Sequence, residues 1–200
     1  MKQAGLMYRG AEAELYKTSY MGIECVLKKR VPKSFRLKDI DEKIRQQRTR
    51  TEIKSLISAR KIVNAPRVLQ VDLNNAAFTI EYIDGEKLKD IIDEKQIDVE
   101  AIEKTAEAIK AMHDNNLIHG DLTTSNIIRK GNEIYFIDFG LSTNSDKNED
   151  QAVDLLVLKK MLRTSHPRQF EEIWGLIEKT YGSKPISEKI IEIEKRARYF

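Results

Sequence analysis

The feature that most constrains this chain is the stretch from Leu117 to Ile128, which is followed by Ile137-Asp138-Phe139-Gly140. Asp121 and Asn126 flank the sequence Leu-Thr-Thr-Ser, and Asp138 stands at the end of an apolar run. Between Asn126 and Asp138, two short apolar segments enclose a polar Lys-Gly-Asn-Glu turn, which predicts a tight hairpin. A hairpin would bring Asn126 and Asp138 side by side. The alternative is that Asp121 and Asn126 only cap turns.

These three side chains suit phosphoryl transfer from a nucleotide, in which the protein mainly holds metal and aims the acceptor. Asp121 and Asn126 have the spacing of the kinase catalytic loop, where the Asp takes or orients the acceptor's proton and the Asn oxygen ligates Mg²⁺. Asp138 would join the metal to the β- and γ-phosphates of ATP. We therefore predict that Asp121 is catalytic and that Asn126 and Asp138 bind Mg²⁺ and nucleotide. His119 is expected to pack and to hydrogen-bond backbone.

A phosphate-covering hairpin is expected between Gly5 and Lys17 if the chain is a kinase. The three-glycine pattern of such hairpins is absent, because Ala11 and Ala13 stand in place of glycines. Gly10 remains at a plausible turn, where backbone amides can approach phosphate. Gly10 is therefore a candidate nucleotide-binding residue.

An alternating strand is predicted over residues 23–28. It places Val26 and Lys28 on one face, while Cys25 points to the other and is expected to be a core residue. Lys28 resembles the phosphate-holding lysine of kinases, and Val26 is expected to cover a face of the adenine ring.

Apolar spacing predicts one or two amphipathic helices between Asp39 and Lys61. Glu52 lies in this region, and its carboxylate could pair with Lys28 and direct the ammonium group toward the nucleotide phosphates. Glu42 is a rival for this role, and an exposed helical Glu is the alternative.

A second hairpin is predicted from residues 68–73 and 76–83, which flank Asn74-Asn75. If a hinge between two lobes follows, the backbone near Glu81 and Ile83 would present carbonyl and amide groups to the adenine edge. The alternative is an ordinary edge strand.

The remainder of the chain predicts helices over residues 88–92, 98–112, 152–162, 170–181 and 186–198. Asp154 lies inside the most apolar of them, and a buried carboxylate needs hydrogen-bond donors, so we expect it to hold backbone N–H groups of the catalytic loop. The expected fold class is α+β: a single two-lobed, protein-kinase-like domain over residues 1–200. Its small β-rich N-lobe would span residues 1–83 and its minimal helical C-lobe residues 84–200.

Composition limits the functional classes further. The 34% charged and 40% hydrophobic content is ordinary for a globular protein, and no stretch has the apolar length of a membrane span, so a cytoplasmic location without membrane contact is expected. A net charge of +3 does not by itself indicate a nucleic-acid binder. Basic residues do cluster at Lys28-Lys29-Arg30 with Lys33 and Arg36, and again at Lys195-Arg196-Ala197-Arg198, although a solvated surface is the default interpretation.

Further motifs carry a family resemblance through most of the chain. They are Lys28-x-Arg30-x-x-Lys33-x-Phe35-Arg36, Arg48-Thr49-x-x-Glu52, Glu81-Tyr82-Ile83-x-Gly85, His119-Gly120-Asp121-Leu122-Thr123-Thr124-Ser125-Asn126, Asp138-Phe139-Gly140-Leu141-Ser142 and Glu149-Asp150-x-Ala152-Val153-Asp154-Leu155. Together they resemble the PRPK family, the small atypical, RIO-like serine/threonine protein kinase of the KEOPS (EKC) complex. The resemblance implies a two-lobed kinase that uses ATP and Mg²⁺, autophosphorylates, and acts chiefly as an ATPase within a complex that forms threonylcarbamoyl-adenosine in tRNA.

The same resemblance implies partners. The N-lobe would bind the small regulatory subunit of the complex, and the C-lobe the threonylcarbamoyl-transferase subunit. The basic clusters would contact tRNA phosphates, with an affinity that falls steeply with salt. The C-terminus departs from the family pattern, because it ends Lys195-Arg196-Ala197-Arg198-Tyr199-Phe200 rather than in a denser basic tail with glycine.

Two other functions remain open. His-Gly-Asp-Leu also occurs in aminoglycoside and choline kinases, which suggests a small-molecule phosphotransferase, although residues 144–200 leave little room for a substrate-binding insert. A kinase-fold adaptor without turnover is the other, and intact Lys28, Asp121, Asn126 and Asp138 disfavour it. Gly120 stands where protein kinases place an Arg that pairs with a phosphorylated activation loop, so control by loop phosphorylation is not expected.

Overall fold

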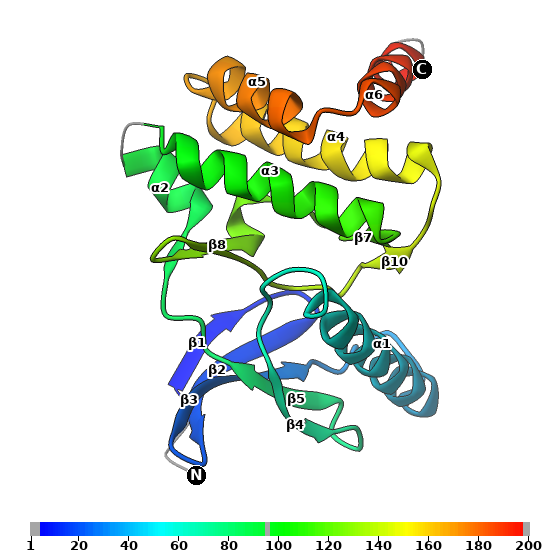
Figure 1. Ribbon diagram of the computed structural model, residues 1–200. Coiled ribbons are helices and arrows are strands. Elements are labelled where there is room, and N and C mark those ends of the chain that lie inside the picture. Colours follow the sequence, from blue (N-terminus) through cyan, green and yellow to red (C-terminus); the bar gives the residue numbers. More distant parts are fainter. Residues whose placement is uncertain (1–4, 95–96, 198–200) are drawn as a thin grey trace. The chain divides into compact units, whose positions relative to one another are not determined.

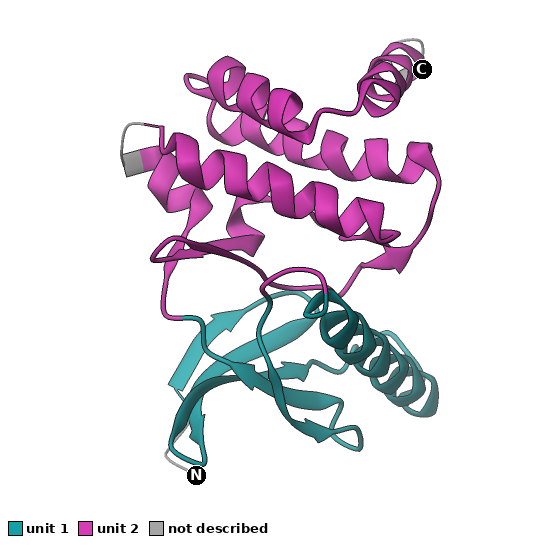
Figure 2. Cartoon of the chain, viewed as in Figure 1, with its two compact units in different colours: residues 1–61, 65–83 teal, residues 62–64, 84–200 magenta. Residues whose placement is uncertain are grey.

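The computed structural model describes residues 5–94 and 97–197 and is drawn in Figure 1. The chain divides into two compact units, which are coloured separately in Figure 2. Unit 1 comprises residues 1–61 and 65–83, and unit 2 comprises residues 62–64 and 84–200. Arg198, the last residue of the C-terminal basic cluster, lies outside the described residues.

Unit 1 is built on a five-stranded antiparallel sheet with the strand order β1-β2-β3-β5-β4. Its strands are β1 (Gly5–Arg9), β2 (Ala13–Tyr20), β3 (Ile23–Arg30), β4 (Val68–Asp72) and β5 (Ala77–Glu81). The predicted hairpin around Asn74-Asn75 is confirmed, because β4 pairs with β5. The Asp72 side chain supports its turn by accepting a hydrogen bond from the Asn75 amide at 3.1 Å.

The central strand β3 and the helix of unit 1 carry Lys28, Arg30 and Glu52. β3 extends to Arg30, two positions beyond Lys28, so these two side chains share a face of the sheet. Cys25 points to the other face and is fully buried, as expected. One continuous helix, α1 (Lys38–Ala59), occupies the region where one or two helices were predicted, and Glu52 lies on its buried side.

Unit 2 is mainly helical, with α5 packed against α3 and α4, and α6 packed against α4 (Figure 1). Its elements are β6 (Glu86–Lys87), α2 (Leu88–Glu94), α3 (Val99–Asp114), β7 (Leu117–Ile118), the 3₁₀ turn η1 (Thr124–Asn126), β8 (Ile127–Lys130), β9 (Glu133–Phe136), β10 (Thr143–Asn144), α4 (Asn148–Ser165), α5 (Phe170–Tyr181) and α6 (Lys184–Ala197). None of the helices within residues 5–94 and 97–197 is both long and apolar enough to span a membrane.

Two helices of unit 2 begin earlier than the apolar pattern indicated. α4 starts at Asn148 rather than at Ala152, because Glu149 and Asp150 form its first turn, where carboxylates favour the positive end of the helix dipole. α6 starts at Lys184 and has Pro185 in its first turn, a position at which proline costs no hydrogen bond. The acidic stretch before the buried helix is therefore part of that helix.

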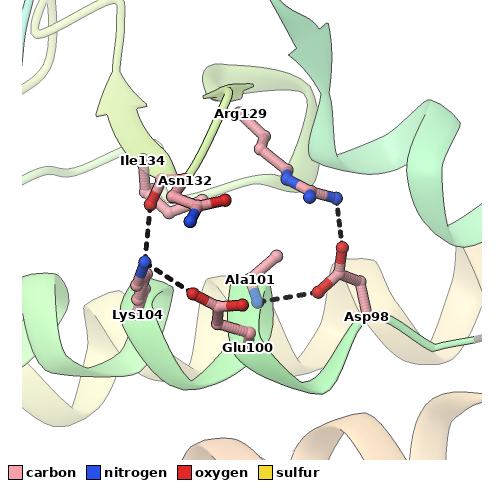
Figure 3. A pocket seen from close by; sticks show the side chains of 7 residues that line it. All are labelled: Asp98, Glu100, Ala101, Lys104, Arg129, Asn132 and Ile134. Atoms are coloured by element: carbon pink, nitrogen blue, oxygen red, sulfur yellow. Dashed lines mark hydrogen bonds and ion pairs between the residues drawn. The ribbon is translucent and has the colours of Figure 1, made fainter.

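The β8–β9 hairpin of unit 2 is fastened to the start of α3 (Figure 3). Arg129 on β8 forms an ion pair with Asp98, the N-cap residue of α3. Lys104 donates to the carbonyl of Asn132 in the hairpin turn at 2.8 Å. On the other strand, the Phe136 amide donates to the Asn64 carbonyl at 2.9 Å, so residues 62–64 belong to unit 2. These contacts fix the hairpin that precedes Asp138.

Candidate active site

Asp121 and Asn126 lie in the loop that connects β7 to β8. The side-chain nitrogen of Asn126 donates to the backbone carbonyl of Asp121 and to its carboxylate Oδ2, both at 2.9 Å. The Asn126 amide closes the 3₁₀ turn by donating to the Thr123 carbonyl at 3.0 Å. Since the Nδ2 atom is committed to Asp121, the atom that Asn126 can offer to a metal is Oδ1.

Asp138 follows the hairpin and is brought beside Asn126 by backbone pairing. Ile127 is in register with Phe136, and the Ile137 amide donates to the Asn126 carbonyl at 2.9 Å. Asp138 has φ +60°, a left-handed conformation that is uncommon for a residue with a side chain. Such conformations cost free energy and concentrate at functional sites, where the surrounding structure enforces them. The sequence prediction that a hairpin joins these two residues is confirmed.

His119 connects the catalytic loop to the segment before Asp138. Its Nε2 lies 3.1 Å from the Ile137 carbonyl, and its Nδ1 accepts a hydrogen bond from the Asp121 amide at 3.3 Å. These partners assign the proton to Nε2 and leave the ring neutral. Burial lowers the pKa of His119, and the nearby Asp154 carboxylate acts in the opposite direction. The expectation that His119 packs and hydrogen-bonds backbone is confirmed.

Gly120 stands at a position that excludes a side chain. Its φ is +80°, and a Cβ atom placed there would lie 2.3 Å from the Leu141 carbonyl oxygen. The close approach arises because β7 pairs with β10, with Ile118 opposite Thr143. An arginine of the kind found in regulated protein kinases therefore cannot occupy this position without displacing the backbone after Gly140.

Asp154 holds the start of the catalytic loop. Its Oδ2 accepts the His119 amide at 2.8 Å and its Oδ1 accepts the Gly120 amide at 2.9 Å. The residue is 1% exposed, so these hydrogen bonds compensate a carboxylate that is withdrawn from water. The predicted role of Asp154 is confirmed.

Two buried histidines near the loop were not predicted. His113, in the last turn of α3, contacts Asp154. His166, just after α4, lies 3.4 Å from the hydroxyl of Thr124 through its Nε2. Its Nδ1 is 2.8 Å from an oxygen of Asp93, without the alignment of a hydrogen bond. His113 continues the apolar stripe of α3, which is the signal that could have indicated it.

In unit 1, Glu52 joins two cations of β3. Its Oε1 is 2.5 Å from Lys28 Nζ and its Oε2 is 2.5 Å from Arg30 Nη2. Glu42, the rival candidate, is half-buried and accepts from Gln46 at 3.3 Å. The structure thus pairs Lys28 with Glu52. Arg30 was assigned only to a basic cluster, although its alternation with Lys28 could have placed it on the same face.

The β1–β2 turn is held by charged side chains. The Gly10 amide donates to the Ala13 carbonyl at 2.9 Å, so in this conformation it serves the turn itself. Glu12 accepts from Arg48 at 2.5 Å and from Arg30 at 3.3 Å. The hydrogen bond from Arg48 is the main reason that the pKa of Glu12 is lowered.

The first basic cluster is mostly engaged within unit 1. Lys28 and Arg30 contact Glu52, Lys33 donates to the Ala11 carbonyl, and Arg36 lies 3.5 Å from Asp41. These contacts favour an internal charge network over a solvated face that is free to bind phosphates.

The other predicted nucleotide-binding residues of unit 1 lie on adjacent strands. Val26 on β3 is paired with Ile80 on β5, and Cys25 with Glu81. The Glu81 side chain pairs with Arg67 at 3.0 Å, so the predicted contact of Glu81 with adenine rests on its backbone and stays a prediction. Ile83, the last residue of unit 1, is buried.

Within the described ranges, no three His, Cys, Asp or Glu side chains come together as a metal cluster. The oxygen donors of Asn126 and Asp138 nevertheless fit Mg²⁺, which commonly takes one or two protein oxygens and completes its shell with phosphate oxygens and water.

The fold and the two loops of unit 2 define a kinase-like protein, and the family follows from a sequence match. Residues 13–164 match the RIO domain model, so the chain belongs to the RIO domain family. The structure is similar to that of the Rio2 kinase from Chaetomium thermophilum, described as an ADP/Mg²⁺-phosphoaspartate complex, with a TM-score of 0.62 and 14% identity over 100% of this chain and 71% of that one. At this identity the likeness shows the fold alone. The predicted α+β, protein-kinase-like fold class is confirmed.

Curated relatives are similar over nearly the whole of this chain. A "probable bifunctional tRNA threonylcarbamoyladenosine biosynthesis protein" from Methanobrevibacter smithii is 42% identical over 97% of this chain and 36% of its own length. A protein of the same name from Methanocaldococcus jannaschii is 38% identical over 97% of this chain and 37% of its own length. The chain thus spans about a third of these relatives. The resemblance to RIO-like kinases linked to this tRNA modification is confirmed.

Proposed function

We propose that this chain is an ATP-dependent phosphotransferase with ATPase activity, organised as one kinase domain over residues 1–200 with an N-lobe of residues 1–83 and a C-lobe of residues 84–200. The observation that carries the proposal is the hydrogen bonding of Asn126, which donates to Asp121 through its side chain and accepts from Ile137 through its backbone. These bonds connect the loop of Asp121 and Asn126 to the segment that leads into Asp138, which supports a phosphoryl-transfer site built from these two loops.

In the proposed reaction Asp121 orients the acceptor and takes its proton. Asn126 Oδ1 and an oxygen of Asp138 would hold Mg²⁺, and the ion would neutralise charge on the phosphates of bound ATP. Lys28, held by Glu52, contributes a positive charge to the phosphates. Gly10 and Val26, with the backbone of Glu81 and Ile83, are proposed to bind the rest of the nucleotide.

The biological process we propose is formation of threonylcarbamoyl-adenosine in tRNA within a KEOPS-type complex. The support is the shared name of relatives to which almost the whole chain is similar. In this proposal unit 2 binds a threonylcarbamoyl-transferase subunit, unit 1 binds a small regulatory subunit, and tRNA contacts the assembly. ATP hydrolysis and autophosphorylation would support the partner transferase in the cytoplasm.

The acceptor that we favour is water, either directly or through a phosphorylated side chain. A carboxylate is one side chain through which such a route could pass, and it can be tested chemically. In such a step a carboxylate oxygen bonds to the γ-phosphorus, ADP leaves, and water later cleaves the acyl phosphate. A label from γ-³²P-ATP that hydroxylamine releases would identify this route.

The test of the proposed function is Mg²⁺-dependent ATP turnover by the full chain, alone and with the transferase partner and tRNA. We expect slow turnover that rises when both are added. Asp121→Ala should lower turnover by about 10²-fold or more, and Asp138→Ala should abolish binding of Mg·ATP. Asp114→Ala, which changes an exposed carboxylate, is the matched control. Unchanged turnover in both site variants would favour an adaptor, and stoichiometric phosphorylation of a small alcohol would favour a small-molecule kinase.

A further inference from the structure

A buried chain of polar side chains runs from α5 to the catalytic loop. The Tyr181 hydroxyl, at the end of α5, lies 2.9 Å from His113 Nδ1. His113 Nε2, in the last turn of α3, lies 3.1 Å from Asp154 Oδ2 on α4. His113 and Asp154 are almost completely inaccessible, and Tyr181 is buried as well. Three helices of unit 2 thus each contribute one member.

The direction of the hydrogen bonds follows from the partners. Asp154 is a carboxylate that already accepts two backbone amides, so it accepts from His113 Nε2–H as well. With a proton on Nε2, the His113 ring accepts at Nδ1, and the Tyr181 hydroxyl donates to it. Burial raises the pKa of Tyr181 far above its usual value, which keeps this donor protonated.

The same carboxylate oxygen serves both ends of this chain. Asp154 Oδ2 accepts from His113 Nε2 and from the His119 amide, while Oδ1 accepts from the Gly120 amide. Gly120 directly precedes Asp121, so the rotation of the carboxylate sets the backbone from which Asp121 projects. The His113 donor at Oδ2 restricts that rotation, because turning the carboxylate would break this bond.

We propose that His113 and Tyr181 are positioning residues for Asp121, acting through Asp154 and the backbone of the catalytic loop. The inference rests on the proposed phosphotransferase function for its kinetic consequence, but its structural consequence can be measured without catalysis. Neither side chain contacts the reacting groups. Their loss should therefore lower kcat and leave the KM for ATP unchanged, because the orientation of Asp121 matters in the transition state.

The first experiment compares Tyr181→Phe with Thr105→Val. Both remove one buried hydroxyl, but Thr105 Oγ1 donates to the Ala101 carbonyl of its own helix, and among the described residues it forms no hydrogen bond with Asp154. We expect Tyr181→Phe to lower kcat about fivefold, the factor typical of one buried hydrogen bond, and to speed amide hydrogen exchange at His119 and Gly120 by a similar factor. Thr105→Val should change neither quantity. Unchanged exchange and kcat in Tyr181→Phe, or equal effects of both variants, would overturn the proposal.

The second experiment tests His113 by conservative rescue. His113→Gln keeps an N–H donor for Asp154, whereas His113→Leu removes it. We expect His113→Gln to retain slow exchange at His119 and Gly120 and His113→Leu to lose it; equal exchange in the two variants would count against the proposal. If His113→Leu does not fold, the comparison of Tyr181→Phe with Thr105→Val still decides. Absence of ATP turnover in the unaltered chain would refute the proposed function, while the exchange measurements would still test the positioning chain.

Discussion

Glu52 in unit 1 and Asp154 in unit 2 are both carboxylates withdrawn from water, with exposures of 3% and 1%. They are compensated in opposite ways. Glu52 contacts two cationic side chains, Lys28 and Arg30, at 2.5 Å each. Asp154 contacts two backbone amides and a histidine ring nitrogen. The first carboxylate balances charge, whereas the second fixes the path of the backbone.

The two modes of compensation imply different responses to the loss of a negative charge. Removing one partner of a buried ion pair leaves a charge without compensation. The free-energy cost of that charge exceeds the net stabilisation that the ion pair provided. A carboxylate held by N–H groups leaves donors partly unsatisfied when it is changed, at a cost of one to a few hydrogen bonds. Replacing each acid by its amide, which keeps the shape, therefore compares the two modes directly.

The largest expected effect is that of Glu52→Gln. It would leave Lys28 and Arg30 close together without an anion at the position of Glu52, and should lower the free energy of unfolding by about 3 kcal/mol. Urea unfolding would measure the loss. Glu42→Gln, in the same helix, is the control and should change stability by no more than about 0.5 kcal/mol. A loss in Glu52→Gln no larger than in the control would show that the ion pairs are not coupled to folding.

The second prediction concerns Asp154→Asn. An amide can still accept one of the loop N–H groups, but its own NH₂ would face donors, so we expect a loss of about 2 kcal/mol in the free energy of unfolding. ATP turnover should fall more than this loss of stability explains, because the loop that carries Asp121 loses its anchor. The measurement is urea unfolding together with turnover at a temperature where the variant is folded. A cost above that of Glu52→Gln would reverse the comparison.

The third prediction is a pH dependence of the free energy of unfolding, which arises from His119 next to Asp154. Burial lowers the pKa of His119 below its usual value of 6.5. The unfolded chain therefore binds a proton before the folded chain does, and stability falls as the pH drops below about 6.5, with a slope of at most about 1.4 kcal/mol per pH unit. Urea unfolding at about pH 7.5 and about pH 5.5, which lie on either side of the usual His pKa, would show this loss of stability. His119→Gln should flatten the dependence; an equally steep dependence in that variant would assign the proton to another group.

The same comparison explains what could be predicted from the sequence. Asp121, Asn126 and Asp138 were recognised because a fixed spacing and a hairpin bring them together locally. Glu52 was recognised because kinases pair the lysine of this strand with a glutamate in a helix that follows it. In the first case the partners are close in sequence. In the second case the charge of Lys28 indicates an acidic partner.

The contacts that were missed arise from packing between helices that are distant in sequence. His113 meets Tyr181 and Asp154 because α5 packs against both α3 and α4. The backbone conformation at Gly120 was also out of reach, since the Leu141 carbonyl that excludes a side chain there depends on the pairing of β7 with β10. The spacing of apolar residues cannot predict such contacts, because it indicates which face of a helix is buried but not which residues that face contacts.

The smallest expected effect is that of Glu12→Gln, which tests charge balance at the exposed end of the Glu52 network. Glu12 is 53% exposed in its side chain and pairs with Arg48 and Arg30, so water and salt screen its contacts. The pKa of Glu12 is lowered mainly by the hydrogen bond from Arg48, so its contribution is present above pH 4.5 and is lost as the pH falls below that value. We expect a loss of at most about 0.5 kcal/mol at low ionic strength that vanishes near 1 M salt. Urea unfolding at two salt concentrations would measure it, and a loss that persists in high salt would mean that Glu12 is coupled to the buried pair of Arg30 and Glu52.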